Sequence, residues 1–243
     1  MDYTKAINDY KQLQGHSALQ LRAVLFDMDG VLFDSMPYHA DAWSKVMTDA
    51  GFNFTREDVY MNEGRTGADT INTASLAQFG KPATQEVIEH LCKEKCRIFD
   101  TYPPTPRMQG ALELVEKVKA SGLTPMIVTG SGTPTLLDRI QSNFPGLFDE
   151  NHIISSFNVK RGKPYPDPYL LALERGGLNP NEAIVVENAP LGVTAGVAAR
   201  LFTIAANTGP LKDEILFNAG ASLVFSSMQA LCNDWGNLFH YLK

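Results

Sequence analysis

The 243-residue sequence has little of what marks secreted, membrane-spanning or nucleic-acid-binding proteins. It has three cysteines, an odd count in a long chain, so we do not expect a disulfide framework. No apolar run approaches a membrane span, and the first residues lack the charged-then-apolar layout of a signal peptide. The net charge is −6 and no run of Lys or Arg exceeds two residues, which disfavours binding to nucleic acid or anionic membranes. We therefore expect a cytoplasmic protein with neither kind of partner.

The length and composition fit a globular protein with one large domain, or with a core and a subdomain. Hydrophobic residues make up 44% and charged residues 20% of the chain, which is ordinary for this class. Cys92 and Cys96 lie four apart, and no second His or Cys pair has zinc spacing, so we interpret them as part of a helix face. We expect a monomer.

A short apolar run at residues 23–26 leads into a pair of acidic residues. The run is too short for a helix and rich in strand formers, which predicts a buried strand. It ends in Asp27-Met28-Asp29-Gly30, and open α/β sheets bind ligands at the carboxyl ends of their strands. Gly30 permits a tight turn that presents the two carboxylates differently to one ligand. One Asp can then attack while the other handles protons, although a strand followed by a plain Asx/Gly turn is the simpler alternative.

Residues 36–106 have helical periodicity throughout. Pro37 can open a helix that Gly51 closes, Thr55 is a suitable N-cap for another, and further helices are expected over 68–79 and 84–100. Linkers are expected at 33–37 and 103–106. An all-helical insert of this kind, placed between two strands on two linkers, can close over the strand ends as a lid.

The rest of the chain alternates between helical and strand patterns. We expect helices over 2–14, 111–121, 134–142, 167–175 and 189–199, and strands over 125–128, 152–154, 183–186, 201–205 and 222–225. Strands separated by helices imply parallel βαβ units and hence a doubly wound parallel α/β sheet. The predicted organisation is a core made of 1–35 and 107–243, in which 1–19 is a helical extension, and a helical cap made of 36–106.

Three later segments bring polar residues to the same edge of the sheet. Thr129-Gly130-Ser131-Gly132 follows a strand and precedes a helix, as a phosphate-binding loop does, although ordinary turns use the same residues. Lys163 stands in the loop Gly162-Lys163-Pro164-Tyr165-Pro166-Asp167-Pro168, and a fixed positive charge there lets a carboxylate approach an anion. Glu187-Asn188 ends another strand, where a helix cap is the alternative interpretation.

In this order, the four segments resemble the four motifs of the haloacid dehalogenase superfamily, and the chain is similar to its β-phosphoglucomutase-like members after residue 20. The resemblance implies a Rossmann-like core with a helical cap. It also implies that Asp27 forms an aspartyl-phosphate, that Asp29 is the general acid and base, that Thr129 holds the phosphoryl group, and that Lys163 balances charge.

The resemblance further implies a Mg²⁺ ion held by Asp27, the backbone carbonyl of Asp29, and the fourth motif, Glu187 and Asn188. The second residue of that motif is usually acidic, whereas Asn188 supplies an oxygen without charge. The metal site is then one negative charge short. We expect the compensating charge to come from Glu63 in the cap.

The cap loop also bears on the substrate. Glu63-Gly64-Arg65 looks like the corresponding loop of the inorganic pyrophosphatase branch of the superfamily, although a solvated surface Glu is the alternative. If the loop closes, Glu63 faces the Mg²⁺, while Gly64, Arg65 and His39 hold a compact anionic leaving group. Gly130 and Ser131 complete the predicted substrate-binding set. The hypothesis is pyrophosphate hydrolysis; the alternatives are a β-phosphoglucomutase-like mutase or sugar-phosphate phosphatase, and a binding protein without turnover.

Overall fold

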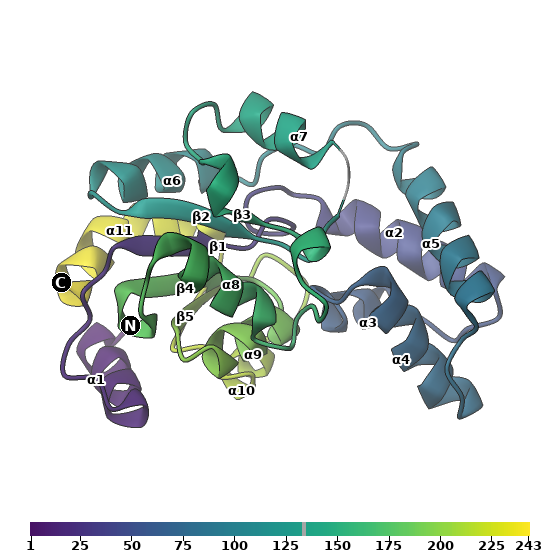
Figure 1. Cartoon of the computed structure of the whole chain (residues 1–243), viewed down its shortest axis with the longest axis horizontal. Coiled ribbons are helices and arrows are strands. Elements are labelled where there is room, and N and C mark those ends of the chain that lie inside the picture. The colour runs from purple at the N-terminus through teal and green to yellow at the C-terminus, as the bar shows by residue number, and fades with distance from the viewer. Residues whose placement is uncertain (133–134) are drawn as a thin grey trace.

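The structure is a computed structural model that describes residues 1–132 and 135–243. Within these residues, six parallel strands form a sheet in the order β3-β2-β1-β4-β5-β6 (Figure 1). The strands are β1 (Ala23–Phe26), β2 (Thr124–Val128), β3 (Ile153–Ile154), β4 (Ala183–Glu187), β5 (Phe202–Ala206) and β6 (Leu223–Phe225). The order places β1 between β2 and β4, which confirms a doubly wound α/β fold.

The described helices fall into two groups, one around the sheet and one beside it. The helices around the sheet are α1 (Tyr3–Gln14), α6 (Ala111–Ala120), α7 (Leu136–Asn143), α8 (Asp167–Gly176), α9 (Pro190–Ala198), α10 (Asp213–Asn218) and α11 (Met228–Leu242). Those beside it are α2 (Met36–Asp49), α3 (Arg56–Met61), α4 (Gly67–Phe79) and α5 (Gln85–Phe99). Figure 1 shows the second group together at one end of the molecule and both chain termini at the other.

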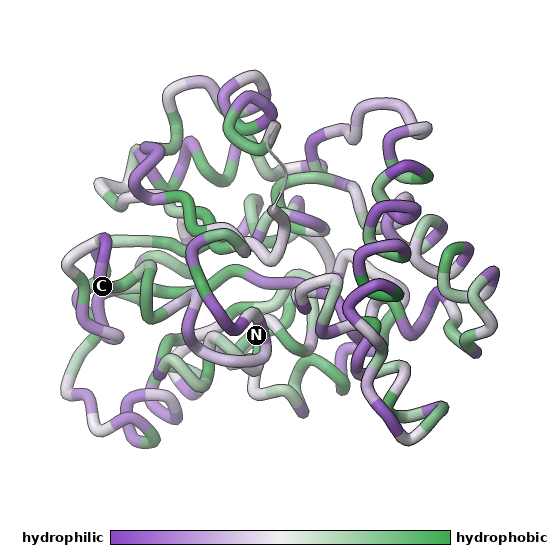
Figure 2. The backbone as a smooth tube through the Cα atoms, turned by 45° about the vertical axis from the view of Figure 1, so that its right-hand side comes forward, coloured by the Kyte–Doolittle hydropathy of each residue, from purple (hydrophilic) through white to green (hydrophobic). Residues whose placement is uncertain are grey.

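The sheet is apolar on both faces because helices cover both of them. Val24 and Phe26 of β1 pack on one side against α1, α6, α7 and α11, whereas Ala23 and Leu25 pack on the other against α8 and α9. All four side chains are fully buried. Buried parallel strands accordingly have continuous apolar sequences, which appear as the green tube at the centre of Figure 2. The outer helices alternate between apolar and polar colours.

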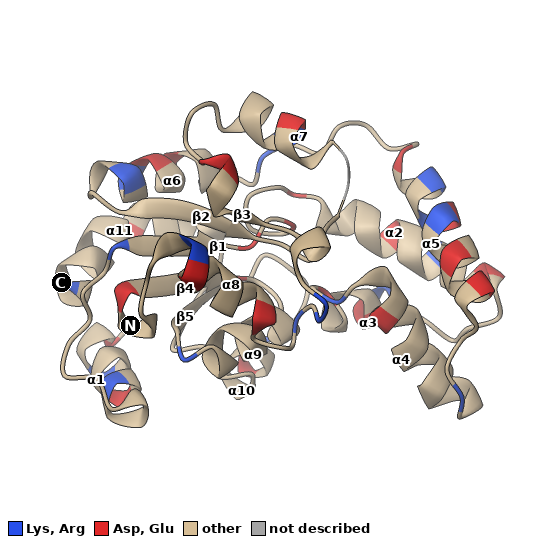
Figure 3. Ribbon diagram, viewed as in Figure 1, with Lys and Arg blue, Asp and Glu red and all other residues tan. Residues whose placement is uncertain are grey.

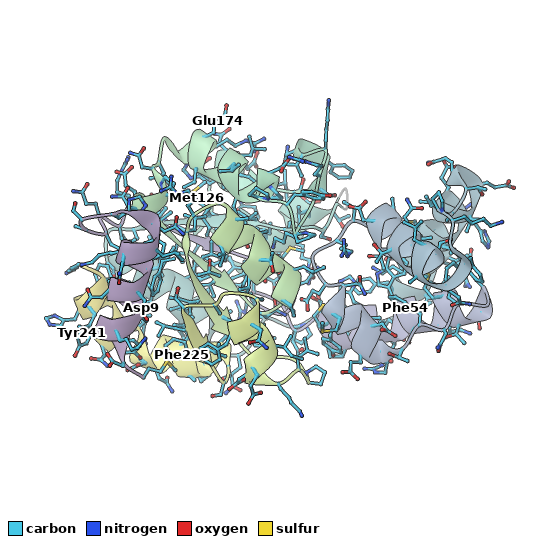
Figure 4. All side chains as sticks on the ribbon, turned by 90° about the horizontal axis from the view of Figure 1, so that it is seen from below. Asp9, Phe54, Met126, Glu174, Phe225 and Tyr241 are labelled. Carbon is cyan, nitrogen blue, oxygen red and sulfur yellow. The ribbon has the colours of Figure 1, made fainter. Side chains whose placement is uncertain are left out.

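Helices α2 to α5 share an apolar cluster, which Leu211 and Ile215 of the core join, and we use the name helical cap for residues 36–106. Figure 4 shows Phe54 among these helices, well away from Met126 and Phe225 of the sheet. The hydroxyl groups of Thr55, Thr66 and Thr84 cap the N-termini of α3, α4 and α5. The cap is thus a packed group of helices beside the sheet.

The two linkers of the cap lie side by side. Phe33 pairs with Arg107 in an antiparallel bridge, the N–H of Asp34 donates to the carbonyl of Pro106, and the N–H of Met108 donates to the carbonyl of Leu32. Farther out, the rings of Tyr38 and Tyr102 stack with their centroids 4.7 Å apart. The chain therefore leaves and re-enters the core at one place, directly behind Asp29.

Some elements differ from the sequence-based expectations. Helices α10 and α11 were not predicted, and His152 belongs to a 3₁₀ turn before β3 rather than to the strand. The predicted helix start at Pro134 lies outside the described residues, and α7 begins at Leu136. Among the described residues, none of the helices is both long enough and apolar enough to cross a membrane.

Candidate active site

The predicted site residues meet in one cavity between the sheet and the cap. The cavity measures about 400 Å³. The core lines it with residues that follow β1 and β2, including Asp27, Asp29 and Thr129, and the cap lines it with α2, α5 and the loop around Glu63. Lys163 and Asn188 join the cluster through hydrogen bonds to Asp27 and Glu63. This is the crevice beyond the carboxyl ends of the central strands.

Lys163 is the most enclosed of these side chains, with 1% of its surface exposed. Its Nζ donates to Oδ1 of Asp27 at 2.5 Å, to Oε1 of Glu187 at 2.6 Å, and to the carbonyl of Val128 at 2.9 Å. All three ammonium protons are therefore used inside the protein. The Lys163 charge is fixed beside Asp27, as the sequence predicted for a charge-balancing lysine.

The pKa values of this pair follow from burial and mutual attraction. Burial raises the pKa of Asp27 to about 8, although the Lys163 ammonium opposes the shift. Burial lowers the pKa of Lys163, but the charges of Asp27 and Glu187 outweigh burial and raise this pKa well above the usual value. A second positive charge near Asp27 would favour the ionised carboxylate that nucleophilic attack requires.

Asp29 sits beside three donor groups. Its Oδ1 accepts a hydrogen bond from the Ser35 hydroxyl at 2.5 Å and lies 3.5 Å from Nε2 of His39 and 4.0 Å from Nη1 of Arg139. Burial alone would raise the pKa of Asp29, but His39, Arg139 and Ser35 together hold it well below its usual range. An ionised Asp29 can accept a proton from water.

His39 occupies a different position from the one expected of a residue that holds the leaving group. Its Nε2 faces Asp29, and its Nδ1 lies 2.9 Å from Nζ of Lys95 on α5. Its ring stacks on Phe99, with centroids 4.4 Å apart. Because both ring nitrogens already have partners, His39 is placed to support Asp29. Lys95 and Arg65 are cations that also line the cavity.

The loop after β2 has the geometry of an anion-binding turn. Thr129 is buried, and its Oγ1 accepts the N–H of Ser131 at 2.9 Å, which leaves the hydroxyl proton free to donate. That bond also occupies the backbone N–H of Ser131, which the sequence had suggested for phosphate. Thr129, Gly130, Ser131 and Gly132 all line the cavity. The Thr129 hydroxyl is therefore better placed than the Ser131 amide to hold a phosphoryl oxygen.

The cap loop is closed on the core. Nδ2 of Asn188 donates to Oε1 of Glu63 at 2.8 Å, so Glu63 is an interdomain contact rather than a solvated surface residue. Burial, together with the charge of Asp27, raises the pKa of Glu63 well above its usual value. Gly30 has φ 77°, and a side chain there would collide with Asn188 and crowd Glu63, so only glycine fits at this position.

Glu187 does not fit its predicted role as a metal ligand. Its Oε1 accepts from Lys163 and from the Tyr169 hydroxyl at 3.0 Å, and its Oε2 accepts the N–H groups of Asn188 and Ala189. Four protein donors thus saturate the carboxylate. Glu187 is a buried anchor for Lys163, and the metal set proposed below omits it.

The remaining oxygen atoms fit a hard divalent cation. The buried Oδ1 of Asn188 has no hydrogen-bond partner in the described structure, and the carboxylates of Asp27 and Glu63 face the same space. Carboxylate and carbonyl oxygens are the ligands that Mg²⁺ prefers, and two anions on one face of a buried site call for a cation. No group of three or more His, Cys, Asp or Glu forms a metal cluster in the described residues. The fit thus depends on the amide of Asn188 and the carbonyl of Asp29.

Sequence reasoning missed two cations of this site. Lys95 is on α5, which carries charges of both signs along its length (Figure 3), and Arg139 is on α7. The guanidinium of Arg139 lies 3.8 Å from the centre of the Phe33 ring and donates to the Thr105 hydroxyl, so it contacts both linkers as well as Asp29. Neither residue stands in a local motif. The one sequence signal for Lys95 is its position three residues after Cys92, which places both side chains on the same face of α5.

A doubly wound sheet with an inserted helical cap, and an Asp-Lys-Thr site at the strand ends, defines a class of phosphoryl-transfer enzymes. The haloacid dehalogenase-like hydrolase family matches residues 21–200, and the chain belongs to this family. The resemblance inferred from the four motifs is thereby confirmed at the family level.

Three similar proteins show the kinds of substrate named within the family. Hexitol phosphatase A of Escherichia coli is 32% identical over 189 residues, which cover 78% of this chain and 84% of that protein. The phosphorylated carbohydrates phosphatase of Thermotoga maritima is 29% identical and covers 83% of this chain and 92% of its own. A Bacteroides vulgatus structure, provisionally named β-phosphoglucomutase, is 54% identical with a TM-score of 0.96, covering 99% of this chain and 98% of its own. Two of these names refer to carbohydrate substrates and the third to a phosphomutase.

Proposed function

We propose that the protein is a Mg²⁺-dependent phosphohydrolase and that its substrate is inorganic pyrophosphate. The contact of Glu63 with Asn188 carries this proposal, because it brings a third carboxylate from the cap to the transfer site. Next to a transferring phosphate, that carboxylate is tolerable only with a cation between them. The ligands would be the carboxylates of Asp27 and Glu63, the backbone carbonyl of Asp29, and Oδ1 of Asn188. A bound Mg²⁺ would neutralise phosphate charge at this point.

The residues of the site can divide the reaction into two displacements. An oxygen of Asp27 bonds to phosphorus while the bridging P–O bond breaks, and the first phosphate leaves. Water then attacks the same phosphorus and Asp29 takes its proton, while the P–O bond to Asp27 breaks. This releases the second phosphate and restores the Asp27 carboxylate, and Asp29 passes the proton on to solvent. Lys163 and the Thr129 hydroxyl hold charge on the transferring group throughout.

The cap side of the cavity supports an anionic leaving group. Lys95 and Arg65 both line it, and Nε of Arg65 donates to Oδ1 of Asn62 at 3.0 Å, which orients the guanidinium. Two cations facing the position of the leaving group suit a phosphate better than a neutral hydroxyl compound.

Hydrolysis of a sugar phosphate is the second candidate. The observation in its favour is the cavity, which at about 400 Å³ has room for a sugar, and the indole of Trp43 offers an apolar wall. The names of the carbohydrate phosphatases among the relatives point in the same direction.

Phosphate release distinguishes the two candidates. We would measure it with Mg²⁺ from pyrophosphate and from a panel of hexose, pentose and hexitol phosphates, using the wild type, Glu63→Ala and the control Glu57→Ala, an exposed residue of α3. Pyrophosphate should lead in kcat/KM, and Glu63→Ala alone should lose that lead. A sugar phosphate that leads by about tenfold, or about 1.4 kcal/mol of transition-state stabilisation, would replace pyrophosphate as the proposed substrate. Absence of turnover with every substrate would favour a binding protein.

A further inference from the structure

The cap loop of residues 62–66 rests on the core at three points. Glu63 contacts Asn188, the backbone of Gly64 lies over Gly130 in the loop after β2, and the other side of Gly64 faces the side chain of Lys163. These points surround the cavity. The distance between the cap loop and the core is therefore set by the core residues that contact Gly64, namely Gly130 and Lys163.

Gly130 leaves the space into which the cap loop descends. A Cβ atom at residue 130 would lie 2.7 Å from the carbonyl oxygen of Gly64 and 3.2 Å from its carbonyl carbon. Both are backbone atoms, so no side-chain rotation could relieve the contact. Gly130 is not among the described residues with positive φ, so its own backbone conformation would accept alanine. The only obstacle to a side chain at this position is the closed cap.

We propose that Gly130 is a specificity-determining residue, because its missing side chain sets the depth of cap closure and so lets Glu63 reach the metal ligands. This inference rests on the proposed function, since it assigns Glu63 to the metal. A methyl group at residue 130 lifts the loop by several tenths of an ångström. Metal–ligand distances vary by only about 0.2 Å, so a small lift is enough to separate Glu63 from an ion held by Asp27 and Asn188.

The lifted loop also changes the room available above the transferring phosphate. When the cap rises, Lys163 keeps its hydrogen bond to Asp27, and Thr129 keeps the one that it accepts from Ser131, because all of these residues belong to the core. Phosphoryl transfer by the core residues should thus persist, while the Glu63 contact with the metal is lost. Substrates whose leaving group needs space should then lose less than pyrophosphate does.

Four glycine variants, two at residue 130 and two controls elsewhere, test the proposal. Gly130→Ala tests the proposal, and Gly130→Ser places the same Cβ atom with a larger side chain. Gly162→Ala is the matched control, because its Cβ would meet the side-chain methyl of Thr66 in the same cap loop at 3.2 Å and the Gly64 oxygen only at 3.6 Å. Gly236→Ala on α11 has nothing within 4 Å and controls for the substitution itself.

A double-mutant cycle with Glu63→Ala provides the test, with Mg²⁺ binding measured by calorimetry and pyrophosphate turnover measured in parallel. Gly130→Ala should weaken Mg²⁺ binding and lower kcat/KM for pyrophosphate by about tenfold or more, since misplacement by about 1 Å can cost about 10². In the Glu63→Ala background it should change Mg²⁺ binding by less than about twofold. Gly130→Ser should act in the same direction as Gly130→Ala, and Gly162→Ala should have a smaller effect.

Two outcomes would overturn the proposal: unchanged Mg²⁺ binding in folded Gly130→Ala and Gly130→Ser, or an equally large effect with and without Glu63. The proposed function fails in a different measurement, namely if the wild-type enzyme has a higher kcat/KM for a sugar phosphate than for pyrophosphate. The calorimetric cycle still decides whether Gly130 acts through Glu63 in that case, because it uses Mg²⁺ without substrate.

Discussion

The ammonium group of Lys95 lies 2.9 Å from Nδ1 of His39, on the opposite side of the imidazole ring from Asp29. An ammonium nitrogen can only donate, so Nδ1 accepts and Nε2 carries the proton that faces the Asp29 carboxylate. Burial and the charge of Lys95 also lower the pKa of His39, although the Asp29 carboxylate opposes this shift. A cap residue thereby fixes the tautomer of the side chain that supports the proposed general base.

Replacing Lys95 by methionine should lower kcat by about tenfold or more with a smaller change in KM. The reason is that His39 is then free to change tautomer, and correctly placed proton transfer is worth about 10²–10⁴ in rate. Steady-state phosphate release measures both constants. Lys93→Met, at an exposed position of the same helix, is the control and should be close to wild type. Equal losses in the two variants would mean that the Lys95–His39 contact has no catalytic part.

Replacing Lys163 by methionine should destabilise the fold as well as abolish turnover. It leaves Asp27 and Glu187 as two buried carboxylates without their shared cation, and the loss of one partner from a buried ion pair costs about 3–5 kcal/mol. Urea unfolding measures the difference. Lys160→Met, in the same loop but exposed, should change the free energy of unfolding by less than about 0.5 kcal/mol. A Lys163 variant as stable as the control would contradict the assignment of a fixed charge.

Replacing Asn188 by aspartate should strengthen Mg²⁺ binding by about tenfold, because the number of ligand charges sets the affinity of oxygen sites for hard cations. Without Mg²⁺ the same change should loosen the cap, since the hydrogen bond from Asn188 to Glu63 becomes a contact between two carboxylates. Calorimetry measures the first effect, and small-angle scattering with and without Mg²⁺ measures the second. A scattering curve that does not respond to Mg²⁺ in Asn188→Asp would contradict the second effect.

Tyr10 should make the stability of the protein depend on alkaline pH. Burial raises its pKa to about 12 from 10.0, so between these values the unfolded chain loses the phenolic proton while the folded chain keeps it. Folding stability from this group is therefore complete below about pH 10 and falls as the pH rises towards 12. Tyr10→Phe should reduce the fall by about 1–2 kcal/mol, after allowance for solvent screening. Urea unfolding of both proteins from pH 8 to pH 11.5 measures it, and parallel curves would contradict the prediction.

The positions of the strands and the polar residues at their carboxyl ends could be predicted because each depends on local sequence. The apolar run at residues 23–26 and the polar turn that follows determine both the central strand and its acidic end. The same holds for Thr129 after β2. Helix α11 was missed although it has a serine N-cap at Ser227 and apolar side chains at helical spacing, so its signal was present in the sequence.

Side-chain pairing across the cavity could not be predicted in the same way. Glu187 and Asn188 are adjacent in sequence, yet one binds Lys163 behind the site and the other faces Glu63 in front of it. Lys95 and Arg139 come from helices whose rotation is set by packing, and no local pattern shows that one contacts His39 and the other Asp29. These contacts depend on tertiary structure, which periodicity does not encode.

The pairing of Phe33 with Arg107 joins the two ends of the cap at one place. Because residues that pair in an antiparallel bridge lie roughly 5 Å apart, the inserted segment begins and ends at nearly the same point of the core. An insertion that starts and ends at one point can vary in length without displacing Asp27 or Thr129. Selection of the substrate then falls to the cap together with the core residues that it touches, Gly130 among them.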